Sequence, residues 1–452
     1  MTTEPQAAQP DRGHLLRVLG VTFGVAVVVG GVIGQGILRT PGVVAEGVQN
    51  PTIIIALWCV AGLVAWIDAM STVELAASIR KTGGPYIFAR RAFGSLTGLA
   101  VGVRDWLGNM GGIAFIAVVF GEYLHRLGVA TSVPIGVLAL LIVVVVGSVQ
   151  WLGTKVGGRS QEIGSAVKAA LFTVLIIGLF LAPRGAPVAT EIAPATAAAL
   201  TFGGIVMALR AISGTYYGWN SASYFCEEVV DPGRTIARAT FSGIAVVTVI
   251  YVLANLAYLN VLTPAEMAGS NLVAADAAGR VFGDVAGPIV TAISLVSLVT
   301  IINAMVMVFP RVLFAMAREY QISTLTRVAA NGTPRLALIA TVLAGGLLAT
   351  IGVYETLLTF STSLLALMSV LVNAAVIVLR VREPNLERPW KMPLYPLPAI
   401  VALAINTTLF VIFVVEDPLT AGKAFGMLAV LIGPGLAAGP AKARCGLIGA
   451  PR

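Results

Sequence analysis

Two short glycine-rich stretches carry most of the binding chemistry that this sequence offers. The first, residues 30–38, reads GGVIGQGIL, and the second, residues 213–220, reads SGTYYGWN. Each interrupts a long apolar segment. A helix that unwinds inside hydrocarbon frees N–H and C=O groups that lipid cannot satisfy, so such backbone survives only where it lines a cavity or binds something. Freed amides suit an anion and freed carbonyls suit a cation, which together match a zwitterion.

Glycine also has a simpler use, because small residues let membrane helices pack closely. The chain has 49 glycines, so either stretch alone is weak evidence for a broken helix. The positions of the two stretches favour broken helices over simple packing, since they fall in the first and the sixth of the apolar segments. Secondary transporters built from inverted repeats place substrate near the bilayer midplane, at paired helices that break there. The matched positions therefore predict a transport site.

Enzyme and metal chemistry are not expected. The paired carboxylates Glu227 and Glu228 have no nucleophile or metal motif nearby that would make them a general acid and base. The three cysteines and two histidines are dispersed, with no spacing typical of a metal site or a disulfide framework. They are Cys59, Cys226, Cys445, His14 and His125. We therefore predict no catalytic residues, no metal and no cofactor.

The elements that must position these stretches are membrane helices. The chain is 58% hydrophobic and 11% charged, whereas soluble domains carry about 25% charged residues. A bilayer core of about 30 Å needs about 20 apolar residues per helix. The sequence predicts an all-α integral membrane protein with about twelve transmembrane helices. The predicted spans are 15–48, 51–79, 93–126, 132–151, 160–182, 196–227, 236–262, 284–318, 335–353, 355–381, 396–416 and 420–439.

The net charge of +8 is explained by topology rather than by nucleic acid binding. Most Lys and Arg residues fall in loops on the side of the N-terminus, and only Arg126, Arg184, Arg280 and Lys423 fall in loops on the other side. The positive-inside rule then places both termini in the cytoplasm. The first span is too long for a signal peptide, so we expect it to be retained in the plasma membrane.

Both glycine-rich stretches resemble the amino acid–polyamine–organocation (APC) superfamily, and more narrowly its L-type amino acid transporter-like bacterial branch. Residues 33–42, IGQGILRTPG, are similar to the signature Ile-Gly-Ser/Thr-Gly-Ile-Phe…Pro-Gly. Residues 216–236 are similar to the pattern Tyr-x-Gly-Trp…Glu-Glu-x-x-x-Pro-x-Arg-x-Ile. Shorter agreements lie at 83–86, at Arg311 with 317–319, and between 379 and 393. The matches run in the family's order from about residue 33 to residue 398.

The resemblance implies a LeuT-type fold, in which spans 1–5 and 6–10 are inverted repeats and two peripheral helices follow. On this chain the parts are a cytoplasmic tail at 1–14, a first repeat at 15–182, a second at 196–381, helices 11 and 12 at 396–439, and a second cytoplasmic tail at 440–452.

The resemblance also implies a substrate site at the two breaks. The amides of Gly34, Gln35 and Gly36 would bind a carboxylate, and the Ile33 carbonyl would bind an amino group together with carbonyls of the sixth-span stretch Gly214, Thr215, Tyr216 and Tyr217. The chain departs from the family twice. Gln35 stands where relatives have Ser or Thr, and Gly214 stands where they have a bulky aromatic residue. We expect the second change either to widen the pocket or to change how it closes.

Lys168 lies in the middle of span 5, where a charge is costly and usually has a task. It matches the lysine that takes the place of a sodium ion in sodium-independent relatives. Our hypothesis is that Lys168 removes any sodium requirement and links the site to protons or to exchange. The alternative is a lysine whose ammonium extends to the membrane surface, which is disfavoured at this depth.

Other polar residues inside the spans have two interpretations each. Arg210 either lines an outer vestibule with Trp219 or pairs with Glu46, Asp105 or Glu122. Asn109 in span 3 and Asn303 in span 8 either reach substrate or form hydrogen bonds between helices. Adjacent Arg104 and Asp105 cannot share a helix face, so each needs its own partner. The remaining carboxylates are interpreted as packing or gate partners, namely Asp68, Glu74 and Glu227.

The function that best fits these features is secondary active transport of an amino acid by alternating access, as a symporter or an antiporter. Spans 1, 2, 6 and 7 would rock against spans 3, 4, 8 and 9. The expected partners are the substrate, the lipid bilayer and protons. Transport of an amine, polyamine or sulfur-containing metabolite is an alternative from the same fold, and a non-transporting membrane sensor is an alternative of another class. Channel-type filters are absent from the sequence.

Overall fold

The computed structural model describes residues 15–181, 202–270, 272–351 and 364–437. The predicted cytoplasmic tails and the first residues of spans 6 and 10 lie outside this range. The described residues are helical apart from connecting turns and one isolated bridge between Leu19 and Val229.

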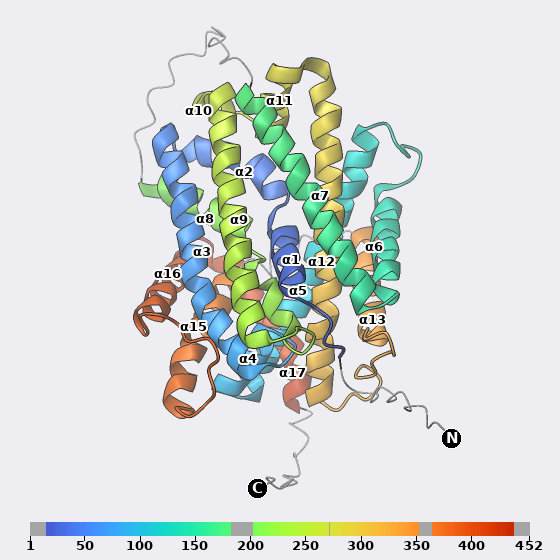
Figure 1. Cartoon of the computed structure of the whole chain (residues 1–452), viewed down its shortest axis with the longest axis vertical. Helices are drawn as coiled ribbons and strands as arrows, with labels where there is room; N and C mark the ends of the chain where they lie inside the picture. The colour runs from blue at the N-terminus through green and yellow to red at the C-terminus, as the bar shows by residue number, and fades with distance from the viewer. Residues whose placement is uncertain (1–14, 182–201, 271, 352–363, 438–452) are drawn as a thin grey trace, which may run out of the picture.

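Each predicted span contains one described helix or a pair of helices (Figure 1). The first half of the chain forms α1 (Val21–Val32), α2 (Gln35–Gly47), α3 (Pro51–Ile79), α4 (Pro85–Phe93), α5 (Ser95–Arg126), α6 (Ile135–Trp151) and α7 (Thr154–Leu181). The second half forms α8 (Phe202–Tyr216), η1 (Trp219–Phe225), α9 (Pro232–Val261), α10 (Pro264–Ala268), α11 (Val273–Phe282), η2 (Gly283–Val285), α12 (Ala286–Glu319), α13 (Arg335–Ile351), α15 (Leu365–Arg382), α16 (Leu397–Glu416) and α17 (Pro418–Ala437).

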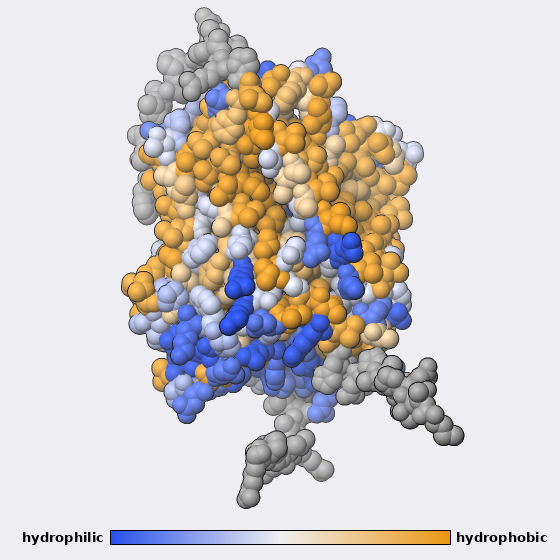
Figure 2. Space-filling view, viewed as in Figure 1, coloured by the Kyte–Doolittle hydropathy of each residue, from blue (hydrophilic) through white to orange (hydrophobic). Residues whose placement is uncertain are grey.

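The described helices suit a bilayer in length and surface. Six are long and apolar enough to cross one, and the bent pair α1 and α2 makes a seventh. Shorter apolar helices are α6, α13, α16 and α17. Figure 2 shows apolar side chains over most of the visible face, with polar ones gathered around α4. The all-helical membrane fold is thus confirmed, while the boundaries of the two five-helix repeats stay a prediction.

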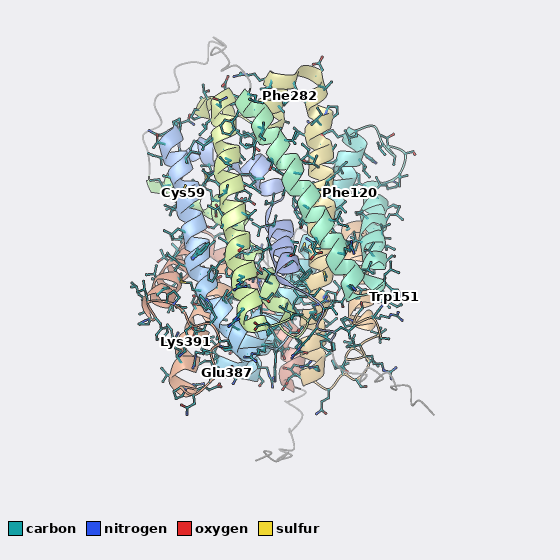
Figure 3. All side chains as sticks on the ribbon, viewed as in Figure 1. Cys59, Phe120, Trp151, Phe282, Glu387 and Lys391 are labelled. Atoms are coloured by element: carbon teal, nitrogen blue, oxygen red, sulfur yellow. The ribbon has the colours of Figure 1, made fainter. Side chains whose placement is uncertain are left out.

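Three helices lie outside the predicted spans and mark the two ends of the molecule. α4 lies at one end, near Glu387 and Lys391, and α10 and α11 lie at the other, near Phe282 (Figures 1 and 3). We call these the α4 end and the α11 end. α10 begins with a capping box, in which Thr263 and Glu266 satisfy each other's backbone N–H groups. For α10, a local side-chain signal therefore marks a helix that the apolar pattern did not predict.

The broken spans lie in the interior and pair half with half. α1 packs against η1, and α2 packs against α8. Around them α7 and α9 cover α1, and α12 contacts α1, α2 and η1. The first and sixth spans therefore contact each other along both halves, and their breaks lie side by side.

Charged residues are distributed unequally between the two ends. At the α11 end, Arg280 donates to Glu266 across 2.6 Å. The α4 end holds many ion pairs that link α3, α4, α12, α15 and the segment after η1. They are Arg80–Glu387, Arg90–Glu319, Arg91–Glu383, Arg311–Glu228, Arg318–Glu227, Arg380–Glu74 and Arg388–Glu74. The expectation that Glu74 and Glu227 are packing or gate partners agrees with these pairs.

Candidate functional site

The first break exposes the N-terminus of α2. α1 ends at Val32, Ile33 is extended, and Gly34 is the N-cap of α2. Between α1 and α2 the chain bends by 47°. The first amides of a helix have no partner within the helix and usually need a side-chain cap. Gly34 has no side chain to supply one, so the positive end of α2 is left for another group.

On the other side of this break, the carbonyls at the C-terminus of α1 bind the side chain of Lys168. The Lys168 ammonium is fully buried and lies 2.8 Å from the Gly30 carbonyl. It also donates to the Ile33 carbonyl, which accepts from the Ser297 hydroxyl at 3.2 Å as well. The structure thus places Lys168 beside the first break, as predicted. Both acceptor positions of the Ile33 carbonyl are occupied.

The sixth break lies within the predicted stretch 213–220, at its second glycine rather than its first. α8 continues through Tyr216, and the chain turns at Tyr217 and Gly218. Gly218 has φ +112°, a conformation that favours glycine. Its carbonyl accepts from the backbone N–H of Ser221 at 3.1 Å and from the Ser221 hydroxyl at 2.6 Å. The span then continues as a 3-10 helix, η1, rather than as an α-helix.

The two breaks touch one another. A side chain on Gly218 would meet the Gly31 carbonyl at 3.1 Å, so glycine permits the approach. The Tyr251 hydroxyl lies 2.9 Å from the Val32 carbonyl and 3.1 Å from the Thr215 carbonyl, and it therefore bridges the ends of α1 and α8. On the side of α2, the hydroxyls of Thr40 and Thr215 are 2.9 Å apart. Hydroxyl groups thus link the two broken spans on both sides.

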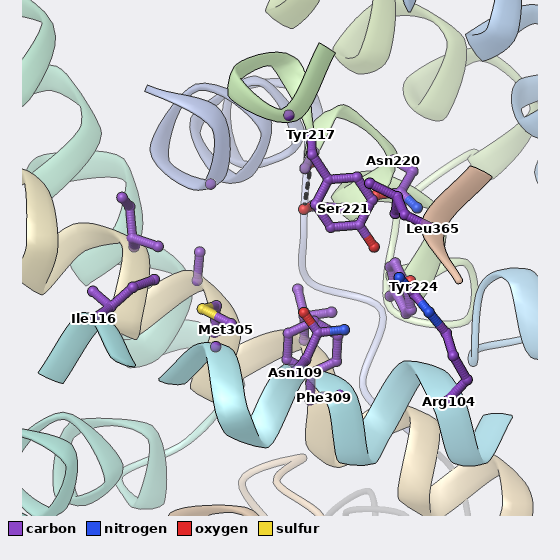
Figure 4. A pocket seen from close by; sticks show the side chains of 18 residues that line it. Arg104, Asn109, Ile116, Tyr217, Asn220, Ser221, Tyr224, Met305, Phe309 and Leu365 are labelled. Atoms are coloured by element: carbon purple, nitrogen blue, oxygen red, sulfur yellow. Dashed lines mark hydrogen bonds between the residues drawn. The ribbon is translucent and has the colours of Figure 1, made fainter. Parts of the chain in front are cut away.

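A cavity of about 290 Å³ lies on the α4 side of the breaks, and we call it the central cavity (Figure 4). Its polar wall includes Asn109, Tyr217 and Ser221, and its apolar wall includes Ile116, Ile301, Met305 and Phe309. The Asn109 amide donates to its own helix, to the Asp105 carbonyl, at 2.6 Å. Asn109 therefore lies where the sequence predicted, facing the same cavity as the sixth break.

A second cavity, of about 360 Å³, lies against the start of α2, and we call it the α2 cavity. Gly34, Gly36, Thr40 and Thr215 line it, which brings the predicted amide site and part of the sixth-span site together. It shares several lining residues with the central cavity. They are Gly31, Ile116, Gly214, Tyr217 and Ile301. Tyr217 is thus a lining residue of both cavities.

Two buried polar pairs close the α4 side of the central cavity. The Tyr224 hydroxyl donates to Asp105 at 2.7 Å, and Tyr224 lies against the Phe309 ring. In the second pair, Arg311 donates two hydrogen bonds to Glu228, at 2.5 and 2.6 Å. A bidentate arginine–carboxylate pair is the strongest of these arrangements. The segment after η1 is thereby fastened to α12.

Arg210 and Trp219 belong to a third space, the side cavity, of about 520 Å³. It lies between α3, α8, α15 and α16, and it reaches Asp417 at the start of α17. Arg210 is exposed there. Of its predicted partners, Asp105 is bonded to Tyr224 instead. The vestibule interpretation of Arg210 and Trp219 is compatible with the side cavity, where Arg210 also interacts electrostatically with Asp417.

Two predicted site residues point elsewhere. The Asn303 amide donates to Gln161 at 2.6 Å and its oxygen accepts from Gln150 at 2.7 Å, so it joins α12 to α7 and α6. The Tyr216 hydroxyl donates to the Trp58 carbonyl at 3.1 Å, and its ring packs on Tyr251. Neither residue lines the central or the α2 cavity. For Gln35 the backbone alone is described, as the first residue of α2.

Sequence reasoning missed several residues that complete the site. Tyr251 and Ser297 hold backbone carbonyls of the first break, and Thr40 contacts Thr215. Each is a hydroxyl residue within an apolar helix, so its type alone gave no signal. One turn of α2 does separate Thr40 from Gly36, which places both on one face and offered a clue.

Comparison with known proteins agrees with this geometry. Residues 19–435 match the amino acid permease family. The chain is 29% identical over 448 residues to the large neutral amino acids transporter small subunit 2 of Oryctolagus cuniculus, covering 95% of this chain and 81% of that protein. It is 26% identical to the serine/threonine exchanger SteT of Bacillus subtilis (strain 168), covering 94% of this chain and 95% of that protein. It is also 27% identical to the human b(0,+)-type amino acid transporter 1, covering 92% and 85%. The chain belongs to the amino acid permease family.

Proposed function

We propose that this protein is a sodium-independent secondary transporter that moves a neutral amino acid across the plasma membrane by alternating access. The observation that carries the proposal is the first break, where the uncapped N-terminus of α2 opens on a cavity while a buried lysine occupies the carbonyls of α1. The names of the relatives support an amino acid as cargo, since they describe transporters and an exchanger of amino acids.

The carboxylate of the substrate is assigned to the amides of Gly34, Gln35 and Gly36. Backbone N–H groups at a helix N-terminus and the helix dipole both favour a negative group. The absence of a side chain at Gly34 and Gly36 leaves room for that group to approach. A substituted side chain at Gly36 would instead meet Thr215 at 2.6 Å.

The amino group of the substrate is assigned to the sixth break. The Ile33 carbonyl, a predicted acceptor, already binds Lys168 and Ser297. Thr215 has one carbonyl position taken by Tyr251. The Gly214 carbonyl accepts from the backbone N–H of Tyr217 at 3.3 Å and keeps a second position. Because Gly214 and Tyr217 line both cavities and Thr215 lines only the α2 cavity, we favour the carbonyls of Tyr217 and Gly214. This revises the predicted acceptor set at Ile33.

The substrate side chain is assigned to the central cavity. Ile116, Ile301, Met305 and Phe309 give it an apolar wall, which suits an apolar side chain. Its volume of about 290 Å³ is at the lower bound of ligand pockets, roughly 300–1,000 Å³. At Gly214 an added side chain would meet nothing within 4 Å, so this position adds width. A substrate larger than serine is therefore favoured.

Coupling to an ion other than sodium follows from Lys168. Its ammonium already lies between the Gly30 and Ile33 carbonyls, where a bound sodium ion would need those oxygens. We infer that transport proceeds by exchange or with protons. The ion pairs at the α4 end would have to open and close in each cycle, whereas the α11 end has fewer to break.

The test is a matched series of ligands on the purified protein and in proteoliposomes. Thermal shift is measured with L-serine, L-leucine and isoamylamine, which is leucine without its carboxylate. At a concentration of about 100 times Kd, a ligand stabilises by about 2.7 kcal/mol. We expect L-leucine to stabilise, isoamylamine to have no effect, and labelled leucine to exchange equally well in sodium and in choline. Stabilisation by the amine alone would favour an amine or polyamine transporter, and binding without exchange would favour a sensor.

A further inference from the structure

We propose that Asp68, in the middle of α3, is a proton-binding site that links transport to pH, and this rests on the proposed function above. Asp68 lies well inside α3, which runs from Pro51 to Ile79, and it is buried, with 8% of its surface exposed. Ionisable groups inside membrane proteins are costly, and carboxylates there often belong to proton pathways. Among the described residues, no lysine or arginine forms an ion pair with it.

The polar contacts of Asp68 come from two neighbouring helices. The Asn373 amide of α15 donates to its Oδ1 atom, and the Asn406 amide of α16 donates to the same oxygen at 3.3 Å. Both amides also donate to their own helices, to the carbonyls of Ser369 and Ala402. Asp68 is therefore held by neutral groups, so its negative charge has no fixed counter-charge among the described residues.

Asn373 supplies an independent sign that this cluster has a second state. Its side chain is fully buried, and its Oδ1 atom has no hydrogen-bond partner among the described residues. An unpaired buried acceptor is costly. An amide carries a donor on one side and an acceptor on the other, so a rotation by half a turn exchanges them. The amide as it stands suits ionised Asp68, and the rotated amide would accept a hydrogen bond from protonated Asp68.

Two cavities connect Asp68 with water and with the sixth break. The side cavity runs from Asp68 and Asn406 to Asp417, which is exposed at the start of α17. A smaller cavity, of about 20 Å³, runs from Asp68 to Tyr217 and Asn220. A proton can thus pass from water in the side cavity to a carboxylate oxygen of Asp68, which becomes a neutral carboxylic acid. That acid lies one small cavity away from the proposed substrate site.

The charged and titratable neighbours of Asp68 are few. Among the residues that line its two cavities, these are Arg210, Tyr216, Tyr217 and Asp417. The elements α4, η1, α15 and α16 contribute neutral residues to these linings, and α9 contributes none. On α3 itself, Glu74 is bound to Arg380 and Arg388 and is therefore compensated. Asp68 is the buried carboxylate in this region that is free to change its charge.

Protonation would change how α3 is held. The hydrogen bonds to ionised Asp68 are charge-assisted and hence stronger than those to a neutral acid. They join α3, a helix of the predicted moving bundle, to α15 and α16, which are outside that bundle. Uptake of a proton would weaken this link and ease the movement of α3 together with the sixth span. The pH on the two sides of the membrane would then bias the direction of transport.

The first test measures the proton site without any substrate. Infrared difference spectra of the purified protein are recorded between about pH 6 and 8, a range in which exposed carboxylates stay almost fully ionised. We expect a carboxylic acid band that titrates in the wild type and disappears in Asp68→Asn. The matched control is Glu122→Gln, the same chemical change at an exposed carboxylate on α5, which should keep the band. A titrating band that persists in Asp68→Asn would overturn the proposal.

The second test uses leucine exchange in proteoliposomes over the same pH range. A single titrating group changes its ratio of charged to neutral forms about tenfold per pH unit. Wild-type exchange should therefore depend on pH, Asp68→Asn should be flat, and Asp68→Glu should regain a shifted dependence. If Asp68→Asn does not fold, a shifted infrared titration in Asp68→Glu gives the same answer, and an unshifted one contradicts the proposal. A wild type that transports no amino acid but still shows the Asp68 band would refute the proposed function and leave the proton site standing.

Discussion

The two helix breaks differ in what satisfies their backbone. At the first break a basic side chain, Lys168, binds the carbonyls of Gly30 and Ile33. At the sixth break the ligands are neutral, because the hydroxyls of Tyr251 and Ser221 hold the carbonyls of Thr215 and Gly218. Charge-assisted hydrogen bonds are roughly twice as strong as neutral ones. The first break should therefore be the firmer of the two, and the sixth should be the one that rearranges.

This difference suggests that the two breaks have different roles during transport. A firm first break keeps the α2 amides aimed at the substrate carboxylate in every state. A sixth break held by hydroxyls can exchange its hydrogen-bond partners more easily, and it lies beside Tyr217, which lines both the central and the α2 cavities. The predictions below test this ranking, from the largest expected effect to the smallest.

Removing the Lys168 side chain should have the largest effect on transport. Lys168→Ala leaves the carbonyls of Gly30 and Ile33 without their ligand and creates a buried void. Each lost charge-assisted hydrogen bond costs about 1.5–3 kcal/mol, so we expect leucine exchange to fall at least a hundredfold. Initial rates in proteoliposomes measure this. The matched control is Lys155→Ala, the same change at an exposed site on the same helix, which should keep near wild-type rates.

Crowding the α2 cavity should have the next largest effect. In Gly36→Ala the new methyl group would lie 2.6 Å from the Thr215 side chain, on the wall of the proposed carboxylate site. Overpacking of this kind costs about 1–3 kcal/mol, which predicts a loss of leucine affinity of roughly tenfold. Titration by thermal shift measures it. Gly203→Ala is the control, because a side chain there meets nothing within 4 Å. Unchanged affinity in Gly36→Ala would remove the carboxylate from this position.

Loosening the neutral link between the breaks should have a smaller effect. Tyr251→Phe removes the hydroxyl that lies near the carbonyls of Val32 and Thr215 and keeps the ring. A neutral hydrogen bond contributes about 1 kcal/mol, so we expect about a fivefold change in exchange rate. A loss as large as that of Lys168→Ala would contradict the ranking of the two breaks.

The smallest effect is expected at the α11 end, outside the membrane spans. The hydrogen bond from Arg280 lowers the pKa of Glu266, whose ordinary value is 4.5. A carboxyl group with a lowered pKa stabilises the folded state above its ordinary pKa, and this contribution is lost as the pH falls through the lowered value. Glu266→Gln should therefore lower stability by less than about 1 kcal/mol at neutral pH. Thermal unfolding should show this difference unchanged down to about pH 5 and shrinking below 4.5. A difference that grows on acidification would contradict the sign.

Much of the fold was predictable because each membrane helix needs a long apolar segment, and such segments are visible in the sequence. The first break was also placed well, since Gly34 lies at the junction of α1 and α2. The sixth break lies within the predicted stretch 213–220, but the sequence did not show which of its two glycines forms the turn. Glycine at 214 is compatible with a helix that continues, and the turn occurs at Gly218, whose positive φ is not visible in the sequence. The conversion of the following segment into a 3-10 helix was likewise not predictable.

The site was predictable in its backbone and less so in its side chains. Lys168 was expected beside the first break because it matches the family's lysine there, and a charge in mid-span must face protein or water. The pairing of Arg311 with Glu228 was missed, because two residues 83 positions apart meet only through packing. The same applies to Asn303, whose partners on α6 and α7 satisfy its amide and draw it away from the cavities. Long-range hydrogen bonds of this kind have no local sequence pattern.

The central claim is that the bare amides at the start of α2 bind the carboxylate of an amino acid. An electron cryomicroscopy map of the protein with bound leucine tests it most directly. We predict ligand density in the α2 cavity, with the carboxylate against the backbone of Gly34, Gln35 and Gly36 and the side chain toward Met305. Density confined to the side cavity, or a first span that runs through Gly34 as unbroken helix, would contradict the account.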